Sequence, residues 1–172
     1  MNSRDAILHS ERTVIIGNSG SGKSTFAGRL AARLGIAATD LDPLHWEDEG
    51  YGRKRDEAAA RGLVAEAAAK PRWIIEGVYG WLASVALPRA TALVWLDLPW
   101  SACHAALLAR GPWRTAGEGA FDDLLSWAEG YATRTTSSSF EGHRHLYEDF
   151  IATKFRLRSR REVDELLADL RD

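Results

Sequence analysis

Short apolar runs alternate with longer amphipathic segments along most of this chain. The runs are rich in β-branched and aromatic side chains, and several end at a glycine or an acidic residue. They are apolar at nearly every position rather than at alternate positions, which indicates strands buried on both faces of a sheet. We therefore predict five strands, at residues 13–16, 36–41, 73–75, 92–96 and 154–158.

The segments between the predicted strands have the composition and spacing of helices. In residues 23–34 the apolar positions fall on one helical face, and Gly35 marks the end of the helix. Strands that alternate with helices predict an α/β fold, a parallel sheet covered by helices on both faces. The length of 172 residues fits a single domain, residues 1–172. Further helices are predicted at residues 56–70, 81–87, 99–110, 121–138, 142–150 and 161–170.

Composition and charge narrow the classes of protein that the chain can represent. Hydrophobic residues make up 45% and charged residues 27% of the sequence, and the formal net charge is −2. A general nucleic-acid or membrane binder needs a basic surface, so we expect neither partner. The only cysteine, Cys103, excludes an intramolecular disulfide and favours a reducing compartment. Because no apolar stretch has the length of a membrane span and no signal-peptide pattern is present, we expect a cytoplasmic protein, monomeric or homodimeric.

The strongest functional signal is a glycine-rich segment between the first predicted strand and the helix after it. This segment matches the phosphate-binding pattern G-x-x-x-x-G-K-[ST] in full. The matching residues are Gly17, Asn18, Ser19, Gly20, Ser21, Gly22, Lys23 and Ser24, followed by Thr25. Glycines let the backbone wrap closely around a phosphate, and the backbone N–H groups then point inward at the positive end of the helix. We predict that residues 17–25 bind the phosphates of ATP, with GTP as an alternative.

Two side chains of this segment have distinct predicted roles. Lys23 supplies a positive charge for the β- and γ-phosphates, and Ser24 offers its hydroxyl to Mg²⁺. The alternative interpretation is a glycine-rich turn with an exposed lysine. The position of the motif, directly after a strand and at the start of a helix, favours phosphate binding.

Three of the predicted strands end in acidic residues. Alternation along the second strand puts Asp40 and Asp42 on one side, and the carboxyl ends of parallel strands form the ligand crevice of such sheets. The pair is predicted to hold Mg²⁺ through water or to accept a proton from an acceptor hydroxyl, and the alternative is a helix N-cap. Glu76, which ends the third strand, is predicted to orient a metal-bound water. Asp97, which ends the fourth, is interpreted as the cap of the helix that begins at Pro99.

These motifs resemble the adenylate-kinase-like branch of P-loop proteins, the small nucleoside and nucleotide kinases. The resemblance is carried by residues 14–25, 41–46, 73–79 and 96–99, and it is greatest to the subgroup named topology modulation proteins. It implies a three-layer P-loop NTPase fold with a five-stranded parallel sheet in the strand order 2-3-1-4-5. It also implies a small lid, at residues 110–135, that closes over the phosphates.

The lid of such kinases carries arginines that pair with phosphate oxygens, because a guanidinium can bind two of them at once. By position, the resemblance assigns this role to Arg110 and Arg114, and places Arg134 on the helix that returns from the lid. The alternative for each is a solvated surface arginine.

The chain departs from adenylate kinases at two positions. Gly80 and Ala106 stand where those enzymes carry arginines, one past the acidic end of the third strand and one in the lid helix. The pair Asp40-x-Asp42 instead looks like the acidic pair of small-molecule kinases such as shikimate kinase, which holds Mg²⁺ or an acceptor hydroxyl.

The base and acceptor ends of the site are less marked in the sequence. Residues 159–163 lie where this fold forms its adenine-contacting loop. His45 and Trp46 follow the acidic pair, where acceptors sit in this fold. Trp46 and Tyr79 are each predicted either to stack on a bound ring or to pack in the protein.

The leading hypothesis is a phosphotransferase that moves the γ-phosphoryl group of Mg-ATP to a small acceptor, a nucleotide or a nucleoside. In this hypothesis Asp42, with Asp40, orients the acceptor, and Arg110 and Arg114 close over the transferring group. One alternative is a kinase of a non-nucleotide alcohol, similar to shikimate or gluconate kinase. Another is a nucleotide-responsive regulatory protein without kinase turnover.

Overall fold

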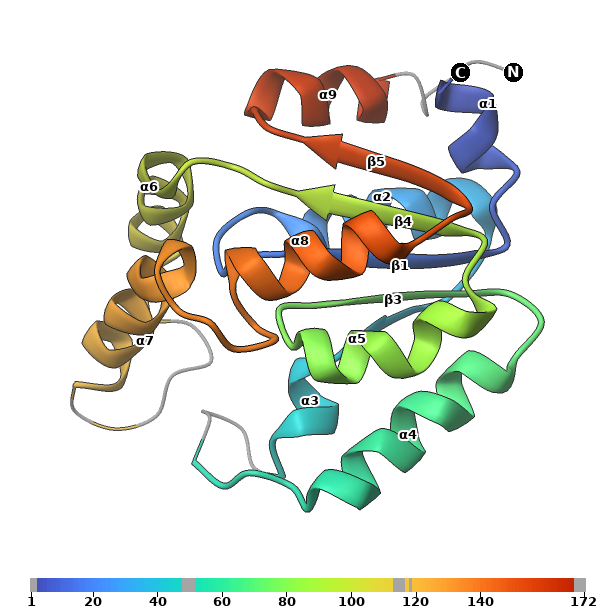
Figure 1. The fold of residues 1–172 in the computed structure, drawn as a ribbon. Coiled ribbons are helices and arrows are strands. Elements are labelled where there is room, and N and C mark those ends of the chain that lie inside the picture. The colour runs from blue at the N-terminus through green and yellow to red at the C-terminus, as the bar shows by residue number, and fades with distance from the viewer. Residues whose placement is uncertain (1–2, 48–51, 113–116, 118, 169–172) are drawn as a thin grey trace.

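A five-stranded parallel sheet organises the chain, and the computed structural model describes residues 3–47, 52–112, 117 and 119–168 (Figure 1). The order of the strands across the sheet is β2-β3-β1-β4-β5, which confirms the predicted order 2-3-1-4-5. The strands are β1 (Arg12–Gly17), β2 (Ala38–Asp40), β3 (Trp73–Gly77), β4 (Ala92–Leu96) and β5 (Thr153–Leu157).

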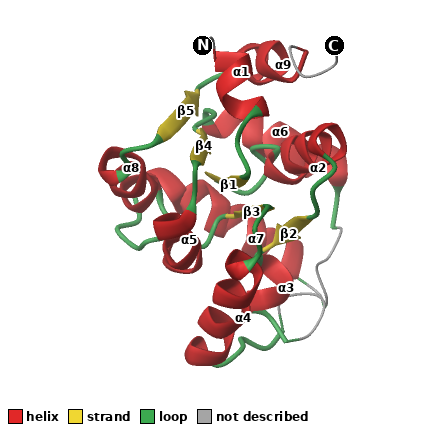
Figure 2. Ribbon diagram, turned by 90° about the vertical axis from the view of Figure 1, so that its right-hand side faces the viewer, coloured by secondary structure: helices red, strands yellow, loops and turns green. Residues whose placement is uncertain are grey.

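Helices cover both faces of this sheet, as predicted. Seen nearly along the strands, α2 and α9 lie on one side of the row of strands, and α5 and α8 lie on the other (Figure 2). No helix within the described ranges is long and apolar enough to cross a membrane. The helices are α1 (Ser3–Leu8), α2 (Lys23–Leu34), α3 (Asp42–His45), α4 (Glu57–Ala69), α5 (Gly80–Ala86), α6 (Trp100–Arg110), α7 (Ala120–Glu129), α8 (Phe140–Asp149) and α9 (Arg160–Ala168), with 3₁₀ turns at Leu87–Arg89 and Gly130–Ala132.

The two faces of the central strands build two separate apolar clusters. Ile15 packs with residues of α2 and α9, whereas its neighbours Val14 and Ile16 pack with residues of α4 and α5. Because both faces are covered, every residue of β3 and β4 is buried. The edge strands β2 and β5 are only partly buried, which explains their weaker apolar pattern in the sequence.

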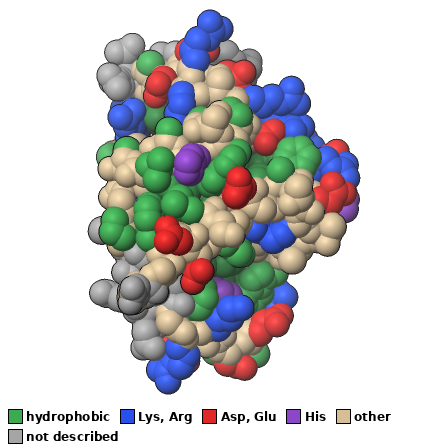
Figure 3. Space-filling model, turned by 90° about the vertical axis from the view of Figure 1, so that its left-hand side faces the viewer, with side chains coloured by type: hydrophobic (Ala, Val, Ile, Leu, Met, Phe, Trp, Pro, Cys, Tyr) green, Lys and Arg blue, Asp and Glu red, His purple; other side chains and the backbone are tan. Residues whose placement is uncertain are grey.

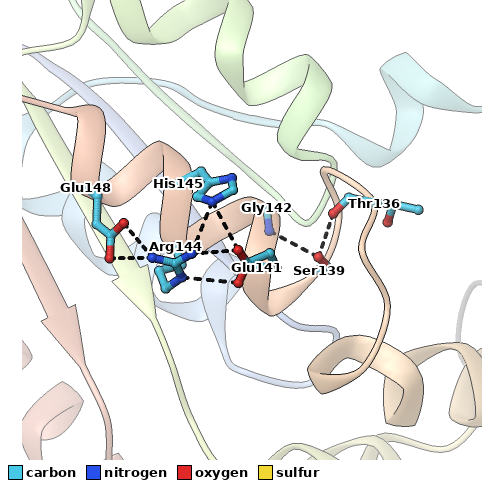
Figure 4. Close-up of polar contacts among 7 residues, drawn as sticks. All are labelled: Thr136, Ser139, Glu141, Gly142, Arg144, His145 and Glu148. Carbon is cyan, nitrogen blue, oxygen red and sulfur yellow. Dashed lines mark hydrogen bonds and ion pairs between the residues drawn. The ribbon is translucent and has the colours of Figure 1, made fainter.

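The helix predicted over residues 121–138 is wrong in its second half. The helix α7 ends at Glu129 and is followed by a 3₁₀ turn and a loop at residues 133–139. This loop is rich in Ser and Thr, whose hydroxyls bind nearby backbone groups and compete with the helix. Ser139 then starts α8, because its Oγ accepts a hydrogen bond from the backbone N–H of Gly142 at 3.1 Å (Figure 4).

The outer face of α8 carries a local network of charged side chains. Arg144 donates hydrogen bonds to Glu141 one turn before it and to Glu148 one turn after it (Figure 4). His145 lies 3.1 Å from the same Glu141 carboxylate. All of these pairs have the i,i+3 or i,i+4 spacing that stabilises a helix, so we interpret the network as structural.

A buried hydrogen-bond chain connects the end of β3 with α8. The Trp95 indole N–H donates to the Tyr131 hydroxyl at 3.1 Å, and that hydroxyl lies 2.8 Å from Nδ1 of His143. Nε2 of His143 lies 2.8 Å from the carbonyl oxygen of Val78, so this nitrogen carries the proton and the Tyr131 hydroxyl donates to Nδ1. Burial lowers the pKa of His143 to about 3, which keeps the ring neutral.

The free energy of unfolding should therefore fall as the pH drops below about 6.5, where an imidazole in the unfolded chain takes up a proton. The folded chain resists this proton until the pH nears the folded-state pKa of His143, about 3. The contribution of His143 to stability is therefore fully present above about pH 6.5, the pKa of an imidazole in the unfolded chain. It is lost as the pH falls, by roughly 1.4 kcal/mol per pH unit for one such group.

The variant His143→Gln tests this, because Gln can still donate to Val78 but does not titrate. We expect the variant to be less stable than the wild type at about pH 7, and to lose less stability between about pH 7 and about pH 5. Urea unfolding at the two pH values measures both effects. Equal losses in the two proteins would show that His143 does not control the acid sensitivity.

Candidate functional site

A cleft of about 670 Å³ opens at the carboxyl ends of the strands, between the glycine-rich loop and the helices α6, α7 and α9. In Figure 1 this is the left-hand end of the sheet, where α6 and α7 lie. The cleft therefore lies at the edge that the sequence predicted. Its lining residues are Ser19, Gly20, Gly22, Lys23, Ser24, Thr25, Asp40, Asp42, Glu76, Gly77, Val78, Ala106, Arg110, Leu124 and Arg160.

The glycine-rich loop connects β1 to α2 and is closely surrounded by backbone. Gly20 has a φ of 78° and Gly22 a φ of 94°, both in the left-handed region that side chains resist. A Cβ on Gly20 would collide with the carbonyl oxygen of Cys103 and lie 2.8 Å from Cγ of Leu107. A Cβ on Gly17 would lie 2.7 Å from the carbonyl oxygen of Leu96. Glycine is required at these positions because α6 and β4 leave no room for a side chain.

Three residues of the loop do not line the cleft, and one of them, Asn18, holds the loop in place. Asn18 is buried, and its side-chain nitrogen donates to the carbonyl oxygen of Ala128 at the end of α7, at 2.9 Å. The backbone carbonyl oxygen of Asn18 accepts a hydrogen bond from Nζ of Lys23 at 2.8 Å, which holds the ammonium group against the loop. Ser21 and Gly17 are also absent from the lining, and Ser21 Oγ is buried without a hydrogen-bond partner among the described residues.

The carboxylate of Glu76 lies directly beside the loop. Its Oε1 accepts a hydrogen bond from the hydroxyl of Ser24 at 2.7 Å. Burial raises the pKa of Glu76, and the nearby charges of Asp40 and Asp42 raise it further. The charge of Lys23 and the hydrogen bond from Ser24 lower the pKa of Glu76. Lys23, Asp40 and Asp42 are thus close enough to Glu76 to influence the pKa of its carboxyl group.

Asp40 and Asp42 both line the cleft, but not through alternation along one strand. The strand β2 ends at Asp40, and Asp42 is the first residue of the short helix α3. The Asp40 carboxylate accepts from the backbone N–H of Asp42 at 2.9 Å, which fixes the turn between strand and helix. The N-cap of α3 is Leu41, and the helix has no side-chain cap, so the alternative interpretation of Asp40 or Asp42 as a helix N-cap is wrong.

The interpretation of Asp97 as a helix cap is wrong. The helix α6 has no side-chain cap at its N-terminus. Asp97 instead pairs with Arg156 of β5, whose Nε and Nη2 lie 2.9 Å and 2.8 Å from Oδ2 of Asp97. The guanidinium of Arg156 also stacks over Trp95. This pair joins two neighbouring strands and lies outside the cleft lining.

The three predicted lid arginines differ in placement. Arg110, the last residue of α6, lines the cleft. Arg114 lies outside the described residues, so its role stays a prediction. Arg134 is not on a helix returning from the lid: it follows the 3₁₀ turn, donates to the carbonyl oxygens of Trp127 and Ser138, and stacks on the Trp127 ring. Arg134 thus stabilises the loop after α7 and is absent from the lining of the cleft.

Hydrophobic side chains gather on the outer surface at this end of the molecule. Figure 3 views that side, and its middle shows a patch of hydrophobic side chains with Asp, Glu and His side chains among them, while Lys and Arg side chains lie mostly towards the margin. On α6, Leu108 is 53% exposed.

The aromatic residues at the predicted acceptor end pack against one another. The rings of His45 and Tyr79 stack with centroids 4.1 Å apart, and the indole N–H of Trp46 donates to the Tyr79 hydroxyl at 2.8 Å. Burial, with a smaller effect of Lys54, lowers the pKa of His45 to about 4. Of the two predictions for Trp46 and Tyr79, packing in the protein is the one that these contacts favour.

Sequence reasoning missed one residue that contacts the glycine-rich loop. Arg160, the first residue of α9, lines the cleft and donates to two carbonyl oxygens of the loop. The sequence placed it only within the adenine-contacting loop at residues 159–163. One signal was present: a positive charge in the first turn of a helix opposes the helix dipole and needs a compensating partner.

Comparisons with known proteins agree on the fold. No protein-family model and no curated protein sequence matches the chain. A shikimate kinase from Bacteroides thetaiotaomicron has a similar structure, with a TM-score of 0.56 and 18% identity over 94% of this chain and 96% of that chain. A gluconokinase from Sinorhizobium meliloti matches with a TM-score of 0.56 and 17% identity, over 92% of this chain and 90% of that chain. A shikimate kinase from Acinetobacter baumannii in complex with shikimate matches with a TM-score of 0.56 and 16% identity, over 97% of this chain and 94% of that chain.

At these identities the similarity shows the fold alone. The chain has the three-layer P-loop fold of small kinases, which was the predicted fold class. The narrower resemblance to topology modulation proteins stays a prediction.

The crowding around Gly20 predicts a strong effect of a single added methyl group. Gly20→Ala must strain a left-handed backbone and displace the backbone of α6, so we expect a loss of roughly 1–3 kcal/mol in the free energy of unfolding. Gly28→Ala is a matched control, because Gly28 lies within α2 and a Cβ there would have no neighbour within 4 Å. The control should gain about 0.5–1 kcal/mol. Denaturant unfolding of both variants measures the difference, and equal stabilities would contradict the crowding.

Proposed function

We propose that this protein is a kinase that transfers the γ-phosphoryl group of Mg-ATP to a hydroxyl group of a small acceptor. The observation that carries the proposal is the meeting of a phosphate-binding loop with three carboxylates in one cleft. Lys23 and Ser24 begin α2 directly after the loop. Asp40 and Glu76 come from the ends of the neighbouring strands β2 and β3, and Asp42 begins α3. Phosphoryl transfer depends on positioning and charge stabilisation, which such a cleft supplies.

The loop is the proposed site of the nucleotide phosphates. Residues 17–25 would surround them with backbone N–H groups at the N-terminus of α2. Lys23 would exchange its bond to the carbonyl oxygen of Asn18 for the β- and γ-phosphate oxygens. We propose ATP as the nucleotide, with GTP as the alternative.

The oxygen atoms beside the loop fit a Mg²⁺ ion. Within the described ranges no group of three or more His, Cys, Asp or Glu side chains is arranged to hold a metal alone. Mg²⁺ in kinases does not require one, because it is held by one or two protein oxygens together with phosphates and water. The hydroxyl of Ser24 and the carboxylate of Glu76 would hold it, directly or through water. When bound, Mg²⁺ would neutralise charge on the phosphate oxygens.

The acceptor would lie beside Asp42. This carboxylate, fixed by the contact of its backbone N–H with Asp40, would accept a proton from the attacking hydroxyl. Arg110, which also lines the cleft, would pair with the transferring phosphoryl group, and we propose the same role for Arg114. A nucleotide or a nucleoside is the first acceptor that we propose.

A non-nucleotide alcohol is the second candidate, and one observation favours it. A nucleotide acceptor brings its own phosphate, which adenylate kinases meet with an arginine at the position of Gly80. Here a Cβ on Gly80 would collide with the carbonyl oxygen of Ser137, so no side chain fits at this position. Two of the similar solved structures are named shikimate kinase and gluconokinase, and those names are consistent with an alcohol acceptor.

Removal of the Lys23 ammonium group tests the nucleotide site. We expect Lys23→Ala to weaken ATP binding at least about tenfold, because a charge-assisted contact to phosphate is lost. Lys70→Ala is the control, since Lys70 is exposed at the end of α4 and outside the cleft. Isothermal titration with ATP and Mg²⁺ measures both. Unchanged affinity in Lys23→Ala would refute the proposed phosphate site.

The second test combines Asp42→Asn with a panel of acceptors in an assay coupled to ADP formation. The panel contains nucleosides, nucleoside monophosphates and small alcohols including shikimate and gluconate. We expect one class to be phosphorylated, and Asp42→Asn to lower kcat/KM for it about 100-fold or more while ATP affinity changes little. Asp56→Asn makes the same change at the N-cap of α4, where Asn caps as well as Asp, and should be neutral.

The outcomes of this panel separate the alternatives. Turnover of alcohols but of no nucleoside or nucleotide would replace the first acceptor by the second. ATP binding without turnover of any acceptor would contradict the kinase proposal and favour a nucleotide-responsive regulatory protein.

A further inference from the structure

The guanidinium group of Arg160 contacts the backbone of the glycine-rich loop. Nη1 of Arg160 donates to the carbonyl oxygen of Ser21, and Nη2 donates to the carbonyl oxygen of Gly20, both at 2.8 Å. The two acceptors belong to consecutive peptide units, and the donors belong to one planar group with fixed spacing. A lysine ammonium has no such pair of fixed donors, so the contact is specific to arginine.

Arg160 is presented to the loop by a rigid element. Two hydrogen bonds fix the first turn of α9. The Ser159 hydroxyl accepts from the backbone N–H of Glu162 at 3.2 Å, and the Glu162 carboxylate accepts from the backbone N–H of Arg158 at 2.6 Å. Further along the helix, Val163 and Leu166 are buried in the core. The guanidinium therefore has a defined position, although 139 residues separate it from Ser21 along the chain.

The geometry of the peptide bond gives these contacts a consequence for ligand binding. In a planar trans peptide the C=O and the N–H of the next residue point in opposite directions. Fixing the carbonyl of Ser21 towards Arg160 therefore directs the N–H of Gly22 away from Arg160. Gly22 lines the cleft. The N–H of Ser21 is already used within the loop, where it donates to the carbonyl oxygen of Asn18 at 3.2 Å.

The same contact opposes a flip of the peptide units in this part of the loop. A Cβ on Gly22 would lie 2.6 Å from Nη1 of Arg160, so the guanidinium is packed against the loop backbone. Its charge also lies at the negative ends of two peptide dipoles. A flipped peptide would turn a carbonyl oxygen towards the phosphates and an N–H towards a cation, and both changes are unfavourable.

We propose that Arg160 is a positioning residue for nucleotide phosphates: by fixing the carbonyls of Gly20 and Ser21, it holds the loop so that the N–H of Gly22 is available to bind them. The proposal rests on the function proposed above. It differs from the expectation that residues 159–163 contact the base, because it assigns Arg160 to the phosphates and acts through the loop.

The test compares three ligands that share parts of the nucleotide: ADP, inorganic pyrophosphate and adenosine. Their dissociation constants are measured by isothermal titration for the wild type and for Arg160→Met, Arg160→Lys and Arg29→Met. Arg29 is the matched control, because it is exposed on α2 and does not line the cleft. Unfolding midpoints of all four proteins are measured in the same buffer.

We expect Arg160→Met to bind ADP and pyrophosphate about tenfold or more weakly, with adenosine affinity unchanged. Arg160→Lys should lose most of the same affinity, because it keeps the charge but not the paired contact with two carbonyls. Arg29→Met should bind all three ligands as the wild type does. If Arg160→Met does not fold, Arg160→Lys alone decides, by the same comparison.

Three results would overturn the proposal. Wild-type affinity in Arg160→Lys would mean that only the charge matters. An equal loss for adenosine and ADP would mean that Arg160 contacts the base. Unchanged affinity for ADP and pyrophosphate in both Arg160 variants would mean that the contact is structural. If the wild type itself binds neither ADP nor pyrophosphate, the proposed function is refuted as well, so the two failures are distinguishable.

Discussion

The pairing of β1 with a parallel strand on each side is the constraint on which the whole cleft depends. Ile15 is aligned with Glu76 of β3, and Gly17 with Leu96 of β4. A slip of one residue would turn each strand's side chains to the opposite face, against helices packed for a different set. The register is therefore strongly specified by the two apolar clusters. It brings Glu76 to the start of α2, where its carboxylate meets the hydroxyl of Ser24.

The loop that follows β1 is held by three helices that otherwise belong to the walls of the cleft. The backbone of α6 closes against Gly20, α7 accepts a hydrogen bond from Asn18, and α9 supplies Arg160. A binding loop supported in this way has little freedom to lose when a ligand arrives, which favours both affinity and catalysis. It also means that a displacement of α7 acts directly on Asn18, whose carbonyl oxygen accepts from Lys23.

The sequence predicted those features that depend on local pattern. Continuous apolar runs identified the central strands, and the glycines around Lys23 identified the loop. The sheet order came from resemblance, and the structure confirms it. Contacts between distant segments were not predictable in this way. Asp97 looked like a helix cap because its partner Arg156 lies on another strand, 59 residues away. Arg160 was assigned to the base for the same reason, since nothing near it in the sequence indicates the carbonyls that it binds.

The contact between Gly80 and Ser137 has a consequence for how kinases of this fold diverge. Ser137 is pressed between two glycines, Gly80 at the start of α5 and Gly142 in α8, and neither position has room for a Cβ. A descendant of this chain that acquired arginine at position 80 would first have to lengthen or reroute the loop at residues 133–139. Gaining that arginine and remodelling this loop are therefore one coupled evolutionary step, and loop length here should vary together with residue type at position 80 among related chains.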